Sequence, residues 1–140
     1  MAKYMMIFRP TDTAFATGEG FDFGEVLETI GRFNQELISA GVLLAAEGLD
    51  PSPEASVVVD FTGETPVVSD GPYGETKELF TGFYLLDVAS KQEATEWAKR
   101  IPYSDGTKVE IRRVTSIDEL PQDNEWVQKE RAWREVTGQL

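Results

Sequence analysis

Apolar positions follow two different patterns in the first forty residues. Residues 4–9 form a short apolar run that Pro10 ends, and its length and aromatic content predict a β-strand. Residues 22–40 place apolar side chains three and four positions apart, which predicts an amphipathic helix. The chain therefore begins with a strand, a loop and a helix.

Residues typical of helix ends set the expected limits of this helix. Asp22 can cap its start, with Glu25 reaching back from three residues later. Gly41 stands where a left-handed C-terminal cap is expected. Gly31 in the middle weakens the helix relative to alanine, so we interpret it as a point of close approach between helix and sheet.

Further short runs rich in apolar and β-branched residues predict strands at residues 42–49, 57–62, 65–69, 80–88 and 109–114. The runs at residues 57–62 and 65–69 meet across Gly63 and Glu64, which predicts a tight hairpin. Ser90 with Glu93 forms a capping box for a second helix, which Pro102 terminates. A short terminal helix is expected around Trp126 and Trp133.

Without the hairpin, the order of elements is strand, helix, strand, strand, helix, strand. This order predicts an α+β fold with a ferredoxin-like split β-α-β sheet, an inserted β-hairpin and both helices on one face. We expect one domain at residues 1–114 and a C-terminal helical extension at residues 115–140, because 140 residues is the usual size of a single-core chain.

The strands at residues 42–49 and 80–88 are apolar at both odd and even positions. The sheet face away from the helices should therefore need cover, and a second copy would give a homodimeric α/β-barrel. The alternative is a monomer whose terminal helix folds across that face. Trp126 and Trp133 fit either packing on their own domain or packing on a partner.

Composition narrows the function classes. The formal net charge of -12, with Lys and Arg scattered, argues against nucleic-acid binding and against anionic membrane surfaces. No apolar run is long enough to span a bilayer and no signal peptide is read at the start, so we expect a cytoplasmic protein. The chain contains no histidine and no cysteine, so any chemistry must proceed without imidazole or thiolate.

A polar stretch leads directly into the strand at residues 80–88 and is the first choice for lining a ligand cleft. Asp70, Gly71 and Pro72 form a turn, and carboxylates there could act as acid or base while a cation holds an anion. The alternative is that these charges form solvated or intersubunit ion pairs. No metal site or cofactor is expected. The ligand-binding candidates are Arg9, Asp70, Glu75, Thr76, Lys77, Glu78 and Arg112.

The sequence of residues 70–78, DGPYGETKE, closely resembles the signature of the DGPF family, also called YCII-related proteins, which typically reads DGPFAETKE. The likeness extends over about residues 1–114, and it implies the ferredoxin-like dimeric α/β-barrel. Members of that family often carry His or Cys before the proline that ends the second helix. Ile101 stands at that position here, so a histidine-dependent mechanism cannot be carried over to this chain.

Three functional hypotheses follow. The first is a small-molecule-binding or regulatory domain that uses a homodimer cleft near residues 70–78 and the adjoining strand ends. The second is an enzyme that uses carboxylate acid/base chemistry around Asp70, Glu75 and Glu78. The third is a protein-interaction module that recruits a partner through the C-terminal helix.

Overall fold

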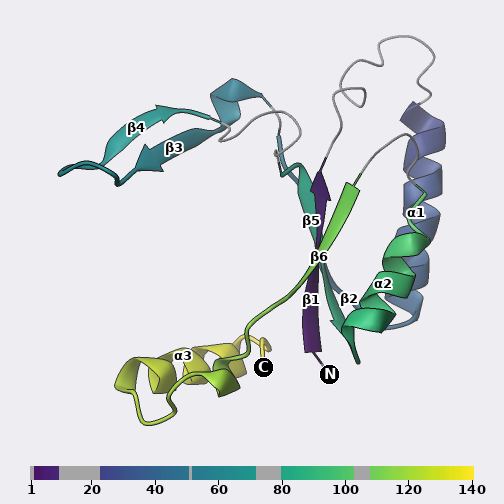
Figure 1. Cartoon of the computed structure of the whole chain (residues 1–140). Helices are drawn as coiled ribbons and strands as arrows, with labels where there is room; N and C mark the ends of the chain where they lie inside the picture. Colours follow the sequence, from purple (N-terminus) through teal and green to yellow (C-terminus); the bar gives the residue numbers. More distant parts are fainter. Residues whose placement is uncertain (1, 10–22, 51, 72–79, 103–107) are drawn as a thin grey trace.

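The computed structural model describes residues 2–9, 23–50, 52–71, 80–102 and 108–140. Four strands form an antiparallel sheet in the order β2-β5-β1-β6. Their bounds are β1 (Ala2–Arg9), β2 (Leu43–Gly48), β5 (Gly82–Val88) and β6 (Lys108–Arg113). Helices α1 (Phe23–Ser39) and α2 (Lys91–Lys99) lie on the same side of this sheet (Figure 1). This arrangement is consistent with the predicted ferredoxin-like α+β fold.

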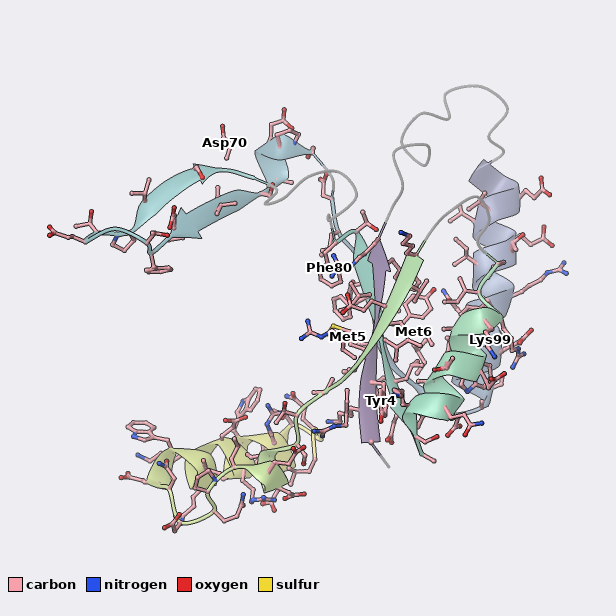
Figure 2. All side chains as sticks on the ribbon, in the orientation of Figure 1. Tyr4, Met5, Met6, Asp70, Phe80 and Lys99 are labelled. Carbon is pink, nitrogen blue, oxygen red and sulfur yellow. The ribbon has the colours of Figure 1, made fainter. Side chains whose placement is uncertain are left out.

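The core lies between the sheet and the two helices. Alternate residues of β1 point into it, because successive side chains of a strand face opposite sides. Figure 2 shows Met6 on the helix side and Met5 on the other side. Met6, Leu37, Leu86 and Val88 are completely buried. The core cluster consists of Tyr4, Met6, Phe8, Phe33, Leu37, Val42, Leu86, Val88 and Ala94.

The C-terminal end of α1 confirms the prediction made from Gly41. This glycine adopts a left-handed conformation with φ of 72°, which costs it little because it has no Cβ. Its amide donates to the Ile38 carbonyl, and the Val42 amide donates to the Leu37 carbonyl. The prediction from Gly31 is wrong, because a Cβ there would meet nothing within 4 Å. Asp22 lies outside the described residues.

Helix α2 begins as its sequence predicts. The Ser90 side chain accepts a hydrogen bond from the Glu93 amide at 3.1 Å. The Glu93 carboxylate reaches back to the amide of Ala89 at 2.7 Å, one residue before the cap. Ile101 follows the helix and packs against the core cluster.

The hairpin stands apart from the main sheet. Strands β3 (Val57–Asp60) and β4 (Val67–Asp70) follow the short helix η1 (Pro53–Ala55). Within the described part of the chain they pair only with each other and form a separate two-stranded sheet. Their pairing ends at Asp60 and Val67, so six residues connect the strands. The predicted tight turn across Gly63 and Glu64 is therefore wrong. At the start of the connection, Asp60 accepts hydrogen bonds from the amide and hydroxyl of Thr62.

The C-terminal extension contains η3 (Ile117–Glu119) and α3 (Glu125–Val136). Ile117 is buried, and Arg113 of β6 donates two hydrogen bonds to the Glu119 carboxylate. Figure 1 shows α3 at the end of the sheet, beyond the face that lacks helices. The terminal helix does not fold across that face as the monomeric alternative required. The sheet in this chain is open, and closure into a barrel remains a prediction.

No helix among the described residues is both long enough and apolar enough to cross a membrane.

Candidate functional site

The strand ends predicted to adjoin a ligand cleft meet at one end of the sheet. Strands β1 and β2 end there and β5 begins there. The Thr81 amide donates to the Phe8 carbonyl at 3.0 Å, and the Leu49 amide donates to the Thr81 carbonyl at 2.9 Å. These bonds tie the three strands together just after the polar stretch at residues 70–78.

A pocket of about 280 Å³ opens at these strand ends on the helix side of the sheet. Its volume is close to the lower limit of small-molecule sites. Most of its side chains are uncharged. The lining residues are Phe8, Asn34, Ala46, Glu47, Gly48, Thr81, Gly82 and Tyr84.

Aromatic rings form one wall of this pocket. The Phe8 and Tyr84 rings meet edge to face, with their centroids 5.0 Å apart. The Phe33 ring stacks on Tyr84 from α1 at 6.3 Å. The tyrosine ring thus contacts Phe8 of β1 and Phe33 of α1, and these contacts restrain its position.

Hydroxyl and amide groups supply the polarity of the pocket. The Tyr84 hydroxyl donates a hydrogen bond to the side-chain oxygen of Asn34. The Thr81 hydroxyl donates to the Phe8 carbonyl at 3.1 Å. The side-chain amide nitrogen of Asn34 and the hydroxyl oxygen of Thr81 are groups that a ligand in the pocket can bond.

Two glycines shape the mouth of the pocket. Gly48 and Gly82 are partners in the register of β2 and β5. A Cβ at Gly82 would lie 2.9 Å from the Glu47 carbonyl oxygen, whereas a Cβ at Gly48 would meet nothing within 4 Å. Gly82 therefore lets the two backbones approach, and Gly48 leaves space open. Glu47 pairs with Phe83, so its side chain starts from the opposite face of the sheet.

Two of the predicted site residues come together on the face without helices. Arg9 donates to the Glu110 carboxylate from Nε at 3.1 Å and from Nη2 at 2.8 Å. Arg112 Nε lies 3.8 Å from the other oxygen of Glu110. Two guanidinium groups thus approach one carboxylate, which brings Arg9 and Arg112 together on this face.

Asp70 and Gly71 lie in the hairpin. Figure 2 shows Asp70 on the hairpin, away from Met5 and Phe80 of the sheet region. The Gly71 amide donates to the Ser56 carbonyl at 3.2 Å, and a Cβ at Gly71 would lie 2.8 Å from the Ser56 hydroxyl oxygen. Close approach of two chain segments thus accounts for this glycine. The predicted residues Pro72, Glu75, Thr76, Lys77 and Glu78 lie outside the described residues.

Two other cavities have features that disfavour them as ligand sites. A shallow groove of about 590 Å³ runs beside α1, and its arginines pair with its own acids, Arg32 with Glu28 and Arg100 with Glu36. A second cavity of about 310 Å³ lies between the sheet and the C-terminal extension. Its basic side chains are all engaged within the chain. They are Lys3, Arg113, Arg131 and Arg134.

The most perturbed carboxylate lies beside that second cavity. Hydrogen bonds from the Arg113 guanidinium, followed by one from the Ser116 amide, lower the pKa of Glu119 from 4.5 to about 2. This shift reflects a structural ion pair that holds the extension to β6. Among the described residues, no group of His, Cys, Asp and Glu side chains is arranged to hold a metal ion.

Tyr84 and Asn34 were not among the predicted site residues. Tyr84 belongs to an apolar strand and Asn34 to the polar positions of a helix, so neither stands out in the sequence. The only sequence signal was the glycine before an aromatic strand, Gly82 with Phe83. Their meeting depends on the packing of α1 against β5.

An open antiparallel sheet in the order β2-β5-β1-β6 with two helices on one face is consistent with a ferredoxin-like α+β protein. Residues 3–118 match the YCII-related domain family, and the chain belongs to this family. It is also 38% identical over 74 residues to an uncharacterised protein of Rhizobium meliloti (strain 1021). That similarity covers 53% of this chain and 59% of the relative.

Proposed function

We propose that this protein binds a small, planar, uncharged molecule in the pocket at the strand ends, as a DGPF-type member of the YCII-related family. The observation that carries the proposal is the pocket itself, which combines aromatic rings with the hydroxyl of Tyr84 and the amide of Asn34. The motif at residues 70–78 supports the DGPF placement through its likeness to the DGPFAETKE signature, and the stretch is soon followed in the chain by Thr81 of the pocket.

The chemistry of the lining favours binding over catalysis. A general acid or base must reach the proton that it transfers. Glu47 is the only carboxylate residue of the described lining, and its side chain starts from the other face of the sheet. The carboxylate mechanism would therefore depend on Glu75 or Glu78, which precede the pocket in the chain.

The binding proposal is tested with 4-hydroxybenzamide, which carries a ring, a hydroxyl and an amide. Saturation-transfer NMR should show contact between this probe and the wild-type protein. Gly48→Val should abolish that contact, because the added side chain enters the space that glycine leaves open. Gly31→Val is the matched control, since Gly31 also has open space around it but lies on α1. Equal binding by wild type and Gly48→Val would contradict the proposal.

We further propose that the protein acts as a homodimer through the face of the sheet that lacks helices. Met5, Phe83 and Leu85 start from this face, as the strand register and, for Met5, Figure 2 indicate, and each is only partly buried in one chain. Two copies of this face would bury apolar surface that a monomer leaves to water. Arg112, whose side chain is largely exposed beside Glu110, would then border the cleft between the copies, where it could bind an anionic group.

Sedimentation velocity tests the dimer. The wild-type protein should sediment as a dimer at micromolar concentration, and Leu85→Glu should shift it to monomer because a charge would be buried at the interface. Ile38→Glu introduces the same charge at an exposed apolar position of α1 and should leave the dimer intact. A monomeric wild-type protein would remove the dimer proposal.

A further inference from the structure

Two parts of the chain carry large apolar side chains that nothing within the described residues covers. On the hairpin, Val57 and Val68 are each 66% exposed and Phe61 is 74% exposed. On α3, Trp126 is 72% exposed, Trp133 is 55% exposed and Val136 is 87% exposed. Neither the hairpin nor α3 lines the proposed ligand pocket.

The hairpin needs a supporting surface for a physical reason. A two-stranded sheet is marginally stable in water unless one of its faces is packed. Val57, Val59 and Val68 share one face of this hairpin, because Val59 pairs with Val68 and Val57 lies two residues before Val59. This face is apolar except for Asp70, which pairs with Val57.

The outward side of α3 is a stripe at helical spacing, formed by Trp126, Lys129, Trp133 and Val136. Lys129 is the only charged member, and its Nζ lies 4.3 Å from the centre of the Trp126 ring. The inward side is already occupied. Arg131 donates to Asp118 and to Gln122. The stripe is thus free for a partner.

The two parts lie at opposite ends of the sheet, and both extend to the side away from α1 and α2 (Figure 1). This is the side on which a second copy would sit in the proposed homodimer. A hairpin and an α3 that extend past the sheet face of one copy would therefore reach the second copy. They cannot cover each other within one chain, because the length of the sheet separates them.

Charge decides which parts meet. Residues 47–70 contain no Lys or Arg and carry six acidic residues, namely Glu47, Asp50, Glu54, Asp60, Glu64 and Asp70. Contact between two hairpins would bring two such segments together, which like charges oppose. Helix α3 has three acidic and three basic residues, and Lys129 of its outward stripe pairs with Glu125 at 2.7 Å, so a hairpin that packs there meets no net like charge.

We propose that the hairpin of one copy packs its valine face on the tryptophan stripe of α3 of a second copy. This inference rests on the proposed homodimer and identifies the hairpin and α3 as the elements that hold its two copies together. The contact occurs twice, because a two-fold axis repeats each pairing. It fixes the hairpin and gives the tryptophans an apolar environment.

Cross-linking tests this pairing cleanly because the chain has no cysteine. Val68→Cys and Val136→Cys chains, one of them with a longer tag, are co-expressed and treated with a short bismaleimide. Cross-linked pairs should contain one chain of each kind, at several times the yield of like pairs. Cross-links mainly between two Val68→Cys chains would overturn the proposal.

A second variant checks the energetic role of the stripe. Trp126→Ser with Trp133→Ser should weaken dimerisation about tenfold or more, as loss of an aromatic anchor does. Glu135→Ser, an exposed change outside the stripe, is the control and should leave the dimer unchanged. Circular dichroism confirms that both variants fold. Unchanged dimerisation in the tryptophan variant would overturn only the contact between the hairpin and α3. A monomeric wild-type protein would overturn the homodimer as well.

Discussion

The hydroxyl of Tyr84 on β5 donates a hydrogen bond to the side-chain oxygen of Asn34 on α1 and so joins helix and sheet at the pocket. Tyr84→Phe keeps the ring between Phe8 and Phe33 but removes this bond. The free energy of unfolding should fall by about 1 kcal/mol, which is typical of one lost hydrogen bond. Urea titration measures this change, and binding of 4-hydroxybenzamide should weaken in the same variant. An unchanged affinity would show that the probe does not use the hydroxyl.

The backbones of β2 and β5 approach closely at Gly82. Gly82→Ala should destabilise the protein by about 1–3 kcal/mol, because its Cβ would lie 2.9 Å from the Glu47 carbonyl oxygen and a strand must move. Gly48→Ala is the matched control in the paired position, where a Cβ meets open space. Thermal unfolding of both variants measures the difference. Equal melting temperatures would contradict the close approach.

Two glycines of the α1 region should respond in opposite directions to alanine. Gly31→Ala should stabilise the protein by up to about 1 kcal/mol, because alanine favours a helix and the site has room. Gly41→Ala should destabilise it by about 1 kcal/mol, because φ of 72° is unfavourable for a residue with a Cβ. Urea titrations of both variants test this. A loss of stability in Gly31→Ala would contradict this expectation and would indicate a close contact between α1 and the sheet at this position.

The ion pair between Glu119 and Arg113 should make the C-terminal extension sensitive to acid. The pKa of Glu119 is lowered to about 2 in the folded protein, so its stabilising effect is complete above the ordinary value of 4.5. The effect is lost as pH falls from 4.5 towards 2. Carbon-13 NMR of the carboxyl group should give the low midpoint. Amide exchange at residues 115–119 should rise over this range in wild type.

Glu119→Gln is the control for that experiment, because its side chain does not titrate. Other carboxylates still protonate in this variant, so only the difference from wild type reports Glu119. Exchange at residues 115–119 should already be faster in Glu119→Gln at neutral pH. Identical pH profiles in the two proteins would contradict the role of the ion pair.

Local features were predictable where the physical cause is local. Gly41 ends α1 because a left-handed residue closes the helix, and Ser90 starts α2 because its side chain accepts the Glu93 amide. The hydrogen bonds involved span at most six residues. Gly31 misled the prediction because a glycine in a helix can face either the sheet or water, and periodicity alone does not decide which.

The pocket could not be predicted in the same way. Tyr84 and Asn34 are fifty residues apart, and they meet only because α1 packs against β5 in this register. Gly48 lies opposite Gly82 because β2 and β5 pair in this register. Residues 70–78 lead in the chain towards Thr81 of this pocket, but their charge drew attention to polar side chains, whereas the lining of the described pocket is aromatic and, apart from Glu47, uncharged.

The sequence by itself determined the order of strands and helices, the helix ends, and the exclusion of histidine and cysteine chemistry, because composition, periodicity and capping act over a few residues. Only the tertiary structure decided which sheet face the helices cover, that the hairpin forms its own sheet, and that Phe8, Asn34 and Tyr84 share a pocket. Those outcomes depend on contacts between distant segments, where burial of a whole face outweighs local preference.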